Sequence, residues 1–381
     1  MNKKVLLIGD INIIFTYEFI LKILRRIDGI QVDIINFAPL SEKNTQRDEH
    51  LRSIGCNISY QPAYAHLKKI RLFHPILRVF EAKRYFVSRK YDVINIHFPG
   101  VDSWIIPHVI KPDTILVTSI YGSDFLRSSK RTNRVLKALF KRSKYITVAS
   151  SFVKNEISIR FQKVFDDKIQ IAKYGSIACE EMHYNLLDIS RDESKQSFGI
   201  PTDRISIMCG YNGSEAQRHI DIIDECKKLP IKYKDKIHLL FHCSYGGNDS
   251  YIQRVRDHLA SSGIPFTFLT EFMTGEKLSR LRKSADIFIN VQPTDVLSAS
   301  MIEELEAGAI CIIGNWLKYP DLEEFGVSLE TINSISDLSI CLSDIIAKQD
   351  EYISKTIVNK GVWKILSWDK DFETWKRLIC D

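Results

Sequence analysis

Two acidic residues, Asp295 and Glu303, stand eight residues apart in the pattern D-x7-E. Their segment predicts a strand, a loop, a helix and a second strand. The apolar run 285–291 is typical of a buried parallel strand, the loop covers 292–299, and the helix is expected over 300–308. Asp295 then lies at the carboxyl end of the strand and Glu303 one turn into the helix. In an open α/β sheet, ligands bind at that edge.

This arrangement could hold a phosphorylated sugar nucleotide. A helix N-terminus offers unpaired N–H groups to a phosphate. Ser298, Ala299 and Ser300 are small enough to let a diphosphate approach the backbone. The carboxylate of Glu303 could accept hydrogen bonds from two ribose hydroxyls, and Asp295 could do the same for a sugar. The alternative is an ordinary loop aspartate and a solvated acidic helix face, because acidic first turns are common.

Composition excludes several classes of protein. The chain has 381 residues, of which 45% are hydrophobic and 26% are charged, as in ordinary globular proteins. The first apolar run is too short for a signal peptide, and no run is long enough to span a membrane. The eight cysteines contain no C-x2-C pair, which indicates reduced thiols. We therefore expect a cytoplasmic protein of two domains, the default at this length.

Charge is distributed unevenly along the chain. Residues 1–175 carry 30 Lys and Arg against 15 Asp and Glu, whereas residues 176–381 carry 23 against 32. Two segments, from Lys68 to Lys90 and from Arg127 to Lys144, hold eight basic residues each among apolar ones. Basic helices of this kind suit an anionic membrane surface, so we expect peripheral contact with the inner membrane face. No nucleic-acid recognition motif accompanies the charge.

Apolar runs alternate with helical stretches in both halves, which predicts βαβ units and parallel sheets. The predicted fold class is α/β, with two Rossmann-like parallel-sheet domains facing across a cleft. We assign residues 1–176 to an N-terminal acceptor domain and 177–360 to a C-terminal donor domain. Residues 361–381 form a tail that crosses back to the first domain, and the polar stretch 177–196 is interpreted as the linker.

Neither domain carries G-x-G-x-x-G after its first strand. The first domain has Gly9, followed by Asp10 and Asn12. The second has Gly210 and Gly213 with different spacing. A nicotinamide dehydrogenase depends on those glycines to bind its dinucleotide, so that class is disfavoured.

The residues around D-x7-E resemble those of GT-B glycosyltransferases, specifically of the retaining family 4 type. That family carries E-x7-E followed by an alanine-rich helix that ends in glycine, and residues 303–308 read EELEAG. The resemblance implies that Glu303 holds the donor's ribose and that Asp295 contacts the transferred sugar. It places Ser298 and Ala299 where the family has a Gly-Leu pair that binds the diphosphate.

Further donor residues follow from the same resemblance. Gly210 and Arg218 are similar to the glycine loop and the basic residue that bind the diphosphate. The stretch from Gly210 to Asn212, together with Tyr245 and Gly246, is similar to bacterial transferases that put amino-deoxy sugars onto lipid carriers. The implied donor is a nucleotide-sugar and the implied acceptor is a saccharide, lipid-linked in surface-polysaccharide synthesis.

On the first domain, Tyr121-Gly-Ser-Asp124 resembles the family's H-G-x-D motif. We place the acceptor near Gly9, Asp10 and Asn12. His97 ends a strand at the same edge, where it either contacts substrate or is a buried imidazole with its hydrogen bonds satisfied. Lys173-Tyr-Gly resembles the crossover between domains, and Ser367-Trp and the helix after it resemble the family's tail.

Two departures leave the activity open. Asp295 is one methylene shorter than the family's glutamate, and Tyr121 replaces a histidine that helps to organise the reacting region. Tyrosine can donate a hydrogen bond but does not become a cation near neutral pH. These changes suit altered donor choice or weakened catalysis. We therefore expect a retaining glycosyltransferase and keep two alternatives, a GT-B nucleotide-sugar epimerase and a binding or scaffold protein that has lost catalysis.

The chain is not expected to use a metal or a cofactor. The family stabilises the leaving diphosphate with protein charges and a helix end, without a required metal. His238 and His242 are four residues apart on a predicted strand with no third ligand nearby. A structural role is the better interpretation for both.

Overall fold

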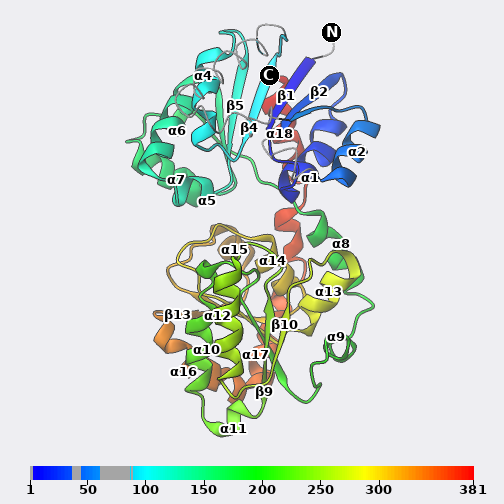
Figure 1. The fold of residues 1–381 in the computed structure, drawn as a ribbon, viewed down its shortest axis with the longest axis vertical. Helices are drawn as coiled ribbons and strands as arrows, with labels where there is room; N and C mark the ends of the chain where they lie inside the picture. Colours follow the sequence, from blue (N-terminus) through cyan, green and yellow to red (C-terminus); the bar gives the residue numbers. More distant parts are fainter. Residues whose placement is uncertain (1–2, 37–43, 61–85, 87–88) are drawn as a thin grey trace. The chain divides into compact units, whose positions relative to one another are not determined.

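The structure, a computed structural model, describes residues 3–36, 44–60, 86 and 89–381. It divides into two compact units (Figure 1). The first unit comprises residues 1–175 together with 368–381, and the second comprises 176–367. Of the basic segment from Lys68 to Lys90, only residues 86, 89 and 90 are described, so the predicted membrane contact there lies outside the described residues.

The described strands of the first unit form one parallel sheet in the order β3-β2-β1-β4-β5-β6-β7. Successive strands are added on one side of β1 as far as β3 and on its other side from β4 onward, so the strand order reverses between β1 and β4. An open α/β sheet binds its ligands at such a reversal. The strands are β1 (Lys3–Gly9), β2 (Ile30–Asn36), β3 (Asn57–Tyr60), β4 (Val93–His97), β5 (Ile115–Ile120), β6 (Tyr145–Val148) and β7 (Ile169–Ile171).

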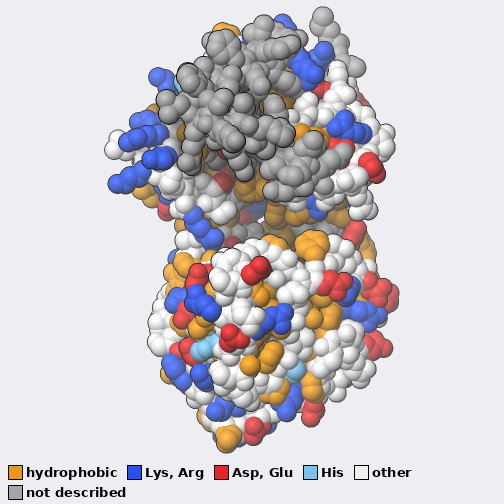
Figure 2. Space-filling view, in the orientation of Figure 1, with side chains coloured by type: hydrophobic (Ala, Val, Ile, Leu, Met, Phe, Trp, Pro, Cys, Tyr) orange, Lys and Arg blue, Asp and Glu red, His pale blue; other side chains and the backbone are white. Residues whose placement is uncertain are grey.

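Helices cover this sheet because each presents an apolar stripe to it. Leu139 of α6 and Ile106 of α4 pack with Leu6, Ile94 and Leu116 of the strands. Basic side chains gather over the α6 and α7 side of this unit (Figure 2). The helices are α1 (Ile14–Lys22), η1 (Leu24–Arg26), α2 (Thr45–Ser53), η4 (Val101–Ile105), α4 (Ile106–Val109), α5 (Ser123–Leu126), α6 (Lys130–Arg142), α7 (Ser151–Arg160), η5 (Asp166–Lys168) and α18 (Phe372–Cys380).

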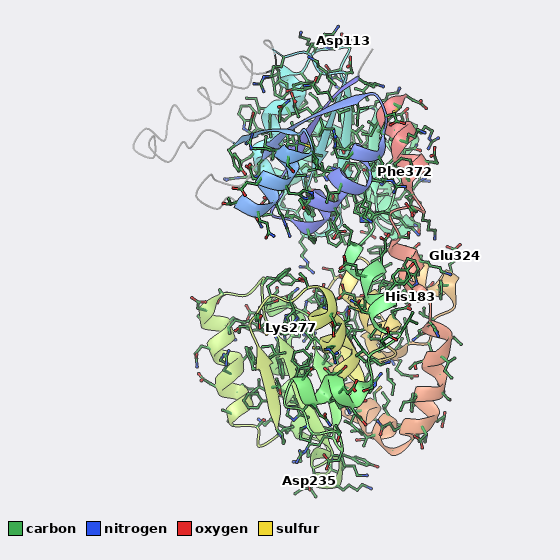
Figure 3. All side chains as sticks on the ribbon, turned by 90° about the vertical axis from the view of Figure 1, so that its right-hand side faces the viewer. Asp113, His183, Asp235, Lys277, Glu324 and Phe372 are labelled. Carbon is green, nitrogen blue, oxygen red and sulfur yellow. The ribbon has the colours of Figure 1, made fainter. Side chains whose placement is uncertain are left out.

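The C-terminal tail completes the first unit. Trp368 is buried and donates its Nε1–H to Oε2 of Glu18 at 3.0 Å. Phe372, at the start of α18, receives the guanidinium of Arg26 at 4.4 Å from its ring centroid (Figure 3). The tail joins this unit at Trp368 rather than at residue 361, because Val362 packs in the core of the second unit.

The second unit repeats the same topology. Its described strands form a parallel sheet in the order β10-β9-β8-β11-β12-β13, which reverses between β8 and β11. Every residue of β8, β9, β11 and β12 is buried, as expected for strands covered on both faces. The strands are β8 (Ile205–Cys209), β9 (Ile237–His242), β10 (Phe266–Leu269), β11 (Ile287–Asn290), β12 (Ile310–Gly314) and β13 (Glu330–Ile332).

Helices α10, α12 and α16 pack on one face of this sheet, and α8, α13 and α14 on the other. The interpretation of 177–196 as a linker is wrong, because this polar stretch forms α8 and most of α9, with Cys179 and Met182 in the core. The helices are α8 (Ile177–Asn185), α9 (Arg191–Ser197), η6 (Glu215–Gln217), α10 (His219–Lys227), α11 (Ile231–Lys234), α12 (Asp249–Ala260), α13 (Gly275–Ser284), α14 (Ala299–Glu306), α15 (Pro320–Phe325), η7 (Ile335–Asp337), α16 (Leu338–Ala347), α17 (Gln349–Lys355), η8 (Thr356–Asn359) and η9 (Val362–Leu366).

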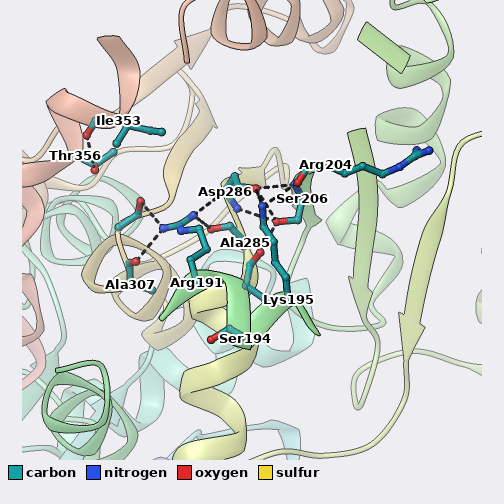
Figure 4. Close-up of polar contacts among 12 residues, drawn as sticks. Arg191, Ser194, Lys195, Arg204, Ser206, Ala285, Asp286, Ala307, Ile353 and Thr356 are labelled. Carbon is teal, nitrogen blue, oxygen red and sulfur yellow. Dashed lines mark hydrogen bonds and ion pairs between the residues drawn. The ribbon is translucent and has the colours of Figure 1, made fainter. Parts of the chain in front are cut away.

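A polar cluster fixes α9 to the far end of α14 (Figure 4). Asp286 is buried and pairs with Lys195 at 2.6 Å and with Arg191 at 3.0 Å. Arg191 also donates to the carbonyl oxygens of Ala307 at 3.2 Å and Gly308 at 3.1 Å. These carbonyls are left unpaired by the end of the helix. Arg191 therefore caps α14 and helps to set the direction of that helix.

All eight cysteines fall within the described residues, where each is a free thiol and six are buried. In the described parts of the chain, no helix is long and apolar enough to cross a membrane.

Candidate active site

The loop between β11 and α14 carries the D-x7-E pattern at the carboxyl edge of the second sheet. Helix α14 begins at Ala299, and Oγ of Ser298 caps it by accepting the N–H of Met301 at 3.2 Å. In a helix capped in this way, the N–H groups of its first two residues have no intrahelical partner. Ala299 and Ser300 occupy those positions, so the end of α14 can receive an anion.

Asp295 is held by two donors at this edge. Its Oδ2 accepts Nδ2–H of Asn290 at 3.1 Å and the hydroxyl of Tyr319 at 2.8 Å. Burial raises the pKa of Tyr319 well above its ordinary value, and Asp295 raises it further. Tyr319 therefore stays protonated and donates. Gln292 extends the network by donating Nε2–H to the hydroxyl of Tyr211 and to Oδ1 of Asn290, both at 3.1 Å.

Glu303 belongs to a buried cluster around Arg282 of α13. The Nε–H of Arg282 donates to Oε2 of Glu303 at 2.9 Å, and Nη1 donates to Oε1 of Glu304 at 3.1 Å. Nη2 donates to Oγ of Ser300 at 3.0 Å. Burial raises the pKa of Glu304 to about 8, although Arg282 opposes that rise. One guanidinium thus serves two carboxyl groups, and Glu304 holds a proton near neutral pH.

Glu304 should make the stability of the second unit fall as pH rises. Its folded-state pKa of about 8 lies above the ordinary value of 4.5 for a glutamate, so folding takes up a proton between these two pH values. The free energy of unfolding should decrease by up to about 1.4 kcal/mol per pH unit in this window. Glu304→Gln removes the titration, and its stability relative to the wild type should rise from pH 5 to pH 8. Urea unfolding at four pH values measures this, and a constant difference would contradict it.

Two loops meet beside this cluster, one after β8 and one after β9. The N–H of Gly213 donates to the carbonyl of Tyr245 at 2.7 Å. A Cβ on Gly247 would lie 2.5 Å from the carbonyl oxygen of Gly213, so the backbones touch and leave no room for a side chain. Gly210 has φ +67°, and Oδ1 of Asn212 accepts the N–H of Ser214 at 2.9 Å. The structure thus brings together the predicted donor residues of these two loops, with Gly246 opposite Asn212.

Tyr245 lies between these loops and the acidic residues. Burial of its phenol raises the pKa, Arg282 lowers it, and both Glu303 and Asp295 raise it. The phenol therefore lies within electrostatic range of both acids of the D-x7-E pattern. Yet 49% of the side chain is exposed, and its ring meets that of Phe272, which is 59% exposed, at a centroid distance of 6.4 Å.

Arg218 takes a separate position at the start of α10. It adopts the left-handed conformation with φ +61°, and its Nε donates to Oδ2 of Asp221 at 2.7 Å. It lines a hollow of about 460 Å³ together with Arg254, Tyr251 and Pro293. The lining near the carboxyl ends of β8 and β11 also contains two acids, because Asp221 pairs with Arg218 at 2.7 Å and Glu215 pairs with Arg254 at 3.7 Å.

In the first unit, Tyr121 forms a hydrogen-bonded chain with His97 and Asn95. Asn95 donates through Nδ2 to Ser119, so its Oδ1 accepts from Nε2 of His97 at 2.8 Å. Burial lowers the pKa of His97 to about 3, so the ring is neutral. With its proton on Nε2, the ring accepts at Nδ1 from the hydroxyl of Tyr121 at 2.8 Å. The tyrosine is therefore held as a donor by a neutral histidine.

The ring of Tyr121 is also stacked between two others. Phe98 lies 3.7 Å from it and Tyr174 lies 3.9 Å from it, centroid to centroid, both at 14°. Phe98 directly follows β4 and has φ +50°, a conformation that bulky residues rarely adopt. Asp124 fixes the backbone by accepting the N–H groups of Tyr121 at 3.1 Å and Gly122 at 2.7 Å. Burial raises the pKa of Asp124 to about 6.

The other residues assigned to the acceptor side lie at the adjacent edge of β1. Oδ1 of Asp10 accepts the N–H of Asn12 at 2.8 Å, which closes a tight turn. A Cβ on Gly9 would lie 3.2 Å from Cβ of His97, so Gly9 allows the two strands to pack closely. The His97 ring has no exposed surface. Of the two alternatives for His97, the structure therefore shows the buried imidazole with its hydrogen bonds satisfied. His97 can influence a ligand through the hydroxyl of Tyr121, which donates to its Nδ1.

Within the described residues, no three metal-ligating side chains gather at one point. His238 contacts Oγ1 of Thr267 at 2.9 Å, and His242 contacts the carbonyl of Glu271 at 3.0 Å. Burial lowers the pKa of each histidine to about 4.

No family model and no curated protein matches this chain by sequence. Solved structures do match it in fold. A glycosyltransferase from Rickettsia africae is 13% identical with a TM-score of 0.67, each chain being covered to 99%. Anabaena Alr3699/HepE, solved in complex with UDP-glucose, is 11% identical with a TM-score of 0.68 and 99% coverage of both chains. Sucrose-phosphate synthase from Thermosynechococcus elongatus is 12% identical with a TM-score of 0.70, covering 99% of this chain and 98% of its own.

Identities this low show the fold alone. The predicted fold class is confirmed, since two parallel-sheet units of seven and six described strands match glycosyltransferases of the GT-B type over nearly the whole chain. This chain has the GT-B fold.

Proposed function

We propose that this protein is a nucleotide-sugar-dependent glycosyltransferase that acts with retention on a saccharide acceptor, lipid-linked in surface-polysaccharide synthesis. One observation carries the proposal. Glu303, Asp295 and the N-terminus of α14 come together at the carboxyl edge of the second sheet, beside the loops that hold Asn212 and Tyr245. This edge lies at the reversal of strand order, where such sheets bind ligands.

Each group has a role in the proposed reaction. The N–H groups of Ala299 and Ser300 hold the diphosphate, and Arg218 supplies positive charge to it. Glu303 accepts hydrogen bonds from the ribose, and Asp295 contacts the transferred sugar. The bond between the anomeric carbon and the phosphate oxygen breaks, and the electron pair leaves with the diphosphate. The sugar passes through an oxocarbenium-like state, which an acceptor hydroxyl attacks as its proton passes to the departing phosphate.

Tyr121 takes the place of the family's histidine in this proposal. Its hydroxyl is already committed as a donor to the neutral ring of His97. It can offer a ligand an accepting lone pair and an aromatic edge, but no positive charge near neutral pH. We therefore assign it to positioning the substrate rather than to stabilising the diphosphate.

Binding and turnover test the proposal separately. UDP, GDP and dTDP are titrated by calorimetry, and their sugar conjugates are screened for protection against thermal unfolding. Donors that bind are incubated with lipid extracts, and the anomeric configuration of the product is read by NMR. If none of the three nucleotides bound, the proposal would be contradicted. Binding without turnover across donors and acceptors would favour the scaffold protein.

A nucleotide-sugar epimerase is a second candidate. UDP-GlcNAc 2-epimerase from Neisseria meningitidis, solved with UDP-GlcNAc bound, matches with a TM-score of 0.58 and 13% identity over 99% of this chain and 98% of its own. An epimerase needs no acceptor. A new sugar isomer formed from the donor alone would therefore favour this candidate over a transferase.

We also propose that the first unit contacts an anionic membrane through α6. Residues 125–155 contain no Asp or Glu. Lys130, Arg134, Lys137 and Lys141 follow one another along the exposed face of α6, spaced by helical turns, while its apolar face is buried. The basic side chains over this region are visible in Figure 2. An exposed cation near an anionic surface contributes about 1 kcal/mol.

Changing these four residues to Glu should reduce binding to phosphatidylglycerol vesicles at least about tenfold, by the loss of that attraction. Co-sedimentation with the vesicles measures this, with phosphatidylcholine vesicles as the neutral comparison. Lys232→Glu with Lys236→Glu changes exposed lysines of the second unit and serves as the control. Equal sedimentation of the α6 variant and the wild type would exclude α6 as the contact.

A further inference from the structure

Arg282 is the cation nearest to the proposed ribose-binding residue, and it lies on a different helix. It is 3% exposed and comes from α13, whereas its acceptors Ser300, Glu303 and Glu304 all lie on α14. Each of three nitrogens of the guanidinium donates to a different side chain, at 2.9 to 3.1 Å. The planar fork of arginine fixes the directions of these bonds. The position of the Glu303 side chain therefore depends on how α13 packs against α14.

The two oxygens of Glu303 differ in their surroundings. Oε2 accepts the Nε–H of Arg282 at 2.9 Å. Within the described part of the chain, Oε1 accepts no hydrogen bond, and it is not among the fully buried polar atoms without a partner. It is therefore the oxygen that can face a ligand. Glu304, in contrast, has no exposed surface, so its remaining oxygen cannot.

The charge of Arg282 is balanced mainly by Glu303. Burial opposes the charge of Arg282, but Glu303 and Glu304 outweigh that effect and raise its pKa. Glu304 is protonated near neutral pH, so the cation has one full counter-charge in Glu303. An apolar contact between α13 and α14 would give comparable stability, since buried ion pairs are often replaceable by hydrophobic residues without loss. Stability alone therefore does not account for an arginine here.

We propose that Arg282 is a positioning residue for the donor site: it occupies Oε2 of Glu303 and thereby aims Oε1 at a ribose hydroxyl of a nucleoside diphosphate. The inference rests on the proposed function, and it names a residue outside the D-x7-E pattern. Arg282 acts through Glu303 and through Ser300, whose backbone N–H belongs to the proposed phosphate site. It does not contact the nucleotide itself.

The test compares UDP with 3′-deoxy-UDP by calorimetry. The wild type should bind the deoxy analogue about tenfold or more weakly than UDP, because a hydrogen bond to a charged group is lost. In Arg282→Lys the charge remains but the fork is lost, so the affinity for UDP should fall about tenfold and the preference over the deoxy analogue should shrink to about twofold. Arg280→Lys is the control, because Arg280 lies on the same helix but pairs with Glu276 at the surface.

A second variant removes the cation altogether. Arg282→Met combined with Glu304→Met leaves the buried Glu303 without its counter-charge, so the melting temperature should fall, whereas Arg282→Lys keeps that charge and should fold as the wild type does. The preference for UDP in the double variant is measured well below its melting temperature, where it should again shrink. Full retention of the preference in either folded variant would overturn the inference. Failure of the wild type to bind UDP, GDP or dTDP would instead overturn the proposed function, and the inference with it.

Discussion

Glu303→Gln should lower the affinity for UDP about a hundredfold, which corresponds to about 2.7 kcal/mol. Hydrogen bonds to a charged acceptor contribute about 1.5–3 kcal/mol each, and the substitution removes the charge while keeping one acceptor oxygen. It also leaves Arg282 without its full counter-charge, so the guanidinium holds the side chain at position 303 more weakly. Calorimetric titration of UDP into the variant measures the loss.

The variant must be shown to fold, because breaking a buried ion pair can cost about 3–5 kcal/mol. Glutamine keeps the shape of Glu303 and can still accept from Arg282, so the melting temperature should change modestly. Glu324→Gln, an exposed residue of α15, is the matched control and should bind UDP as the wild type does. If a folded Glu303→Gln protein bound UDP with unchanged affinity, Glu303 would not be the residue that binds the ribose.

The sequence predicted the strand, loop, helix and strand around Asp295 and Glu303 because each of these signals is local. The apolar runs of β11 and β12 and the small residues before α14 are read from consecutive positions. The predicted helix start differs from the observed one by a single residue, since Ser298 rather than Ala299 is the cap. The side chains that hold the two acids were not predicted.

Arg282 could have been found from its position on α13. Leu278 and Leu281 are buried on this helix, and Arg282 follows Leu278 by four residues, on the same face. A charged residue on a buried stripe needs a partner, which is a signal of its own. Its partners could not be identified, because they depend on how α13 packs against α14.

Tyr319 gave no local signal. It lies 24 residues after Asp295 and reaches it only because β11 and β12 pair in parallel, which brings the loops after these strands together. The interpretation of residues 177–196 as a linker was wrong because it, too, could be corrected only from tertiary packing. Their polar composition is that of a linker, but Cys179 and Met182 point inward from a helix whose outer face is polar.

Asp295→Asn should reduce the rate of sugar transfer about a hundredfold to a thousandfold, as removal of a preorganised charge or dipole does in other sites. The oxygen Oδ2 is held by Asn290 and Tyr319 before any substrate arrives, so in the proposed reaction the carboxylate would already face the positive charge that develops on the sugar. Nucleotide affinity should change by less than about threefold, because the proposal has Asp295 contact the sugar and interact with it most strongly in the transition state.

Tyr319→Phe tests whether preorganisation matters in addition to charge. It removes one of the two hydrogen bonds on Oδ2 and leaves Asn290, so the rate should fall roughly tenfold, an intermediate effect. Single-turnover assays with a donor that binds separate chemistry from product release, and Asp235→Asn at an exposed position is the control. If Asp295→Asn kept the wild-type rate while Tyr319→Phe lowered it, the tyrosine would be acting on the substrate directly and Asp295 would only hold its hydroxyl. If both variants kept the wild-type rate, the D-x7-E pattern would mark a nucleotide site whose first acid has no part in the chemistry.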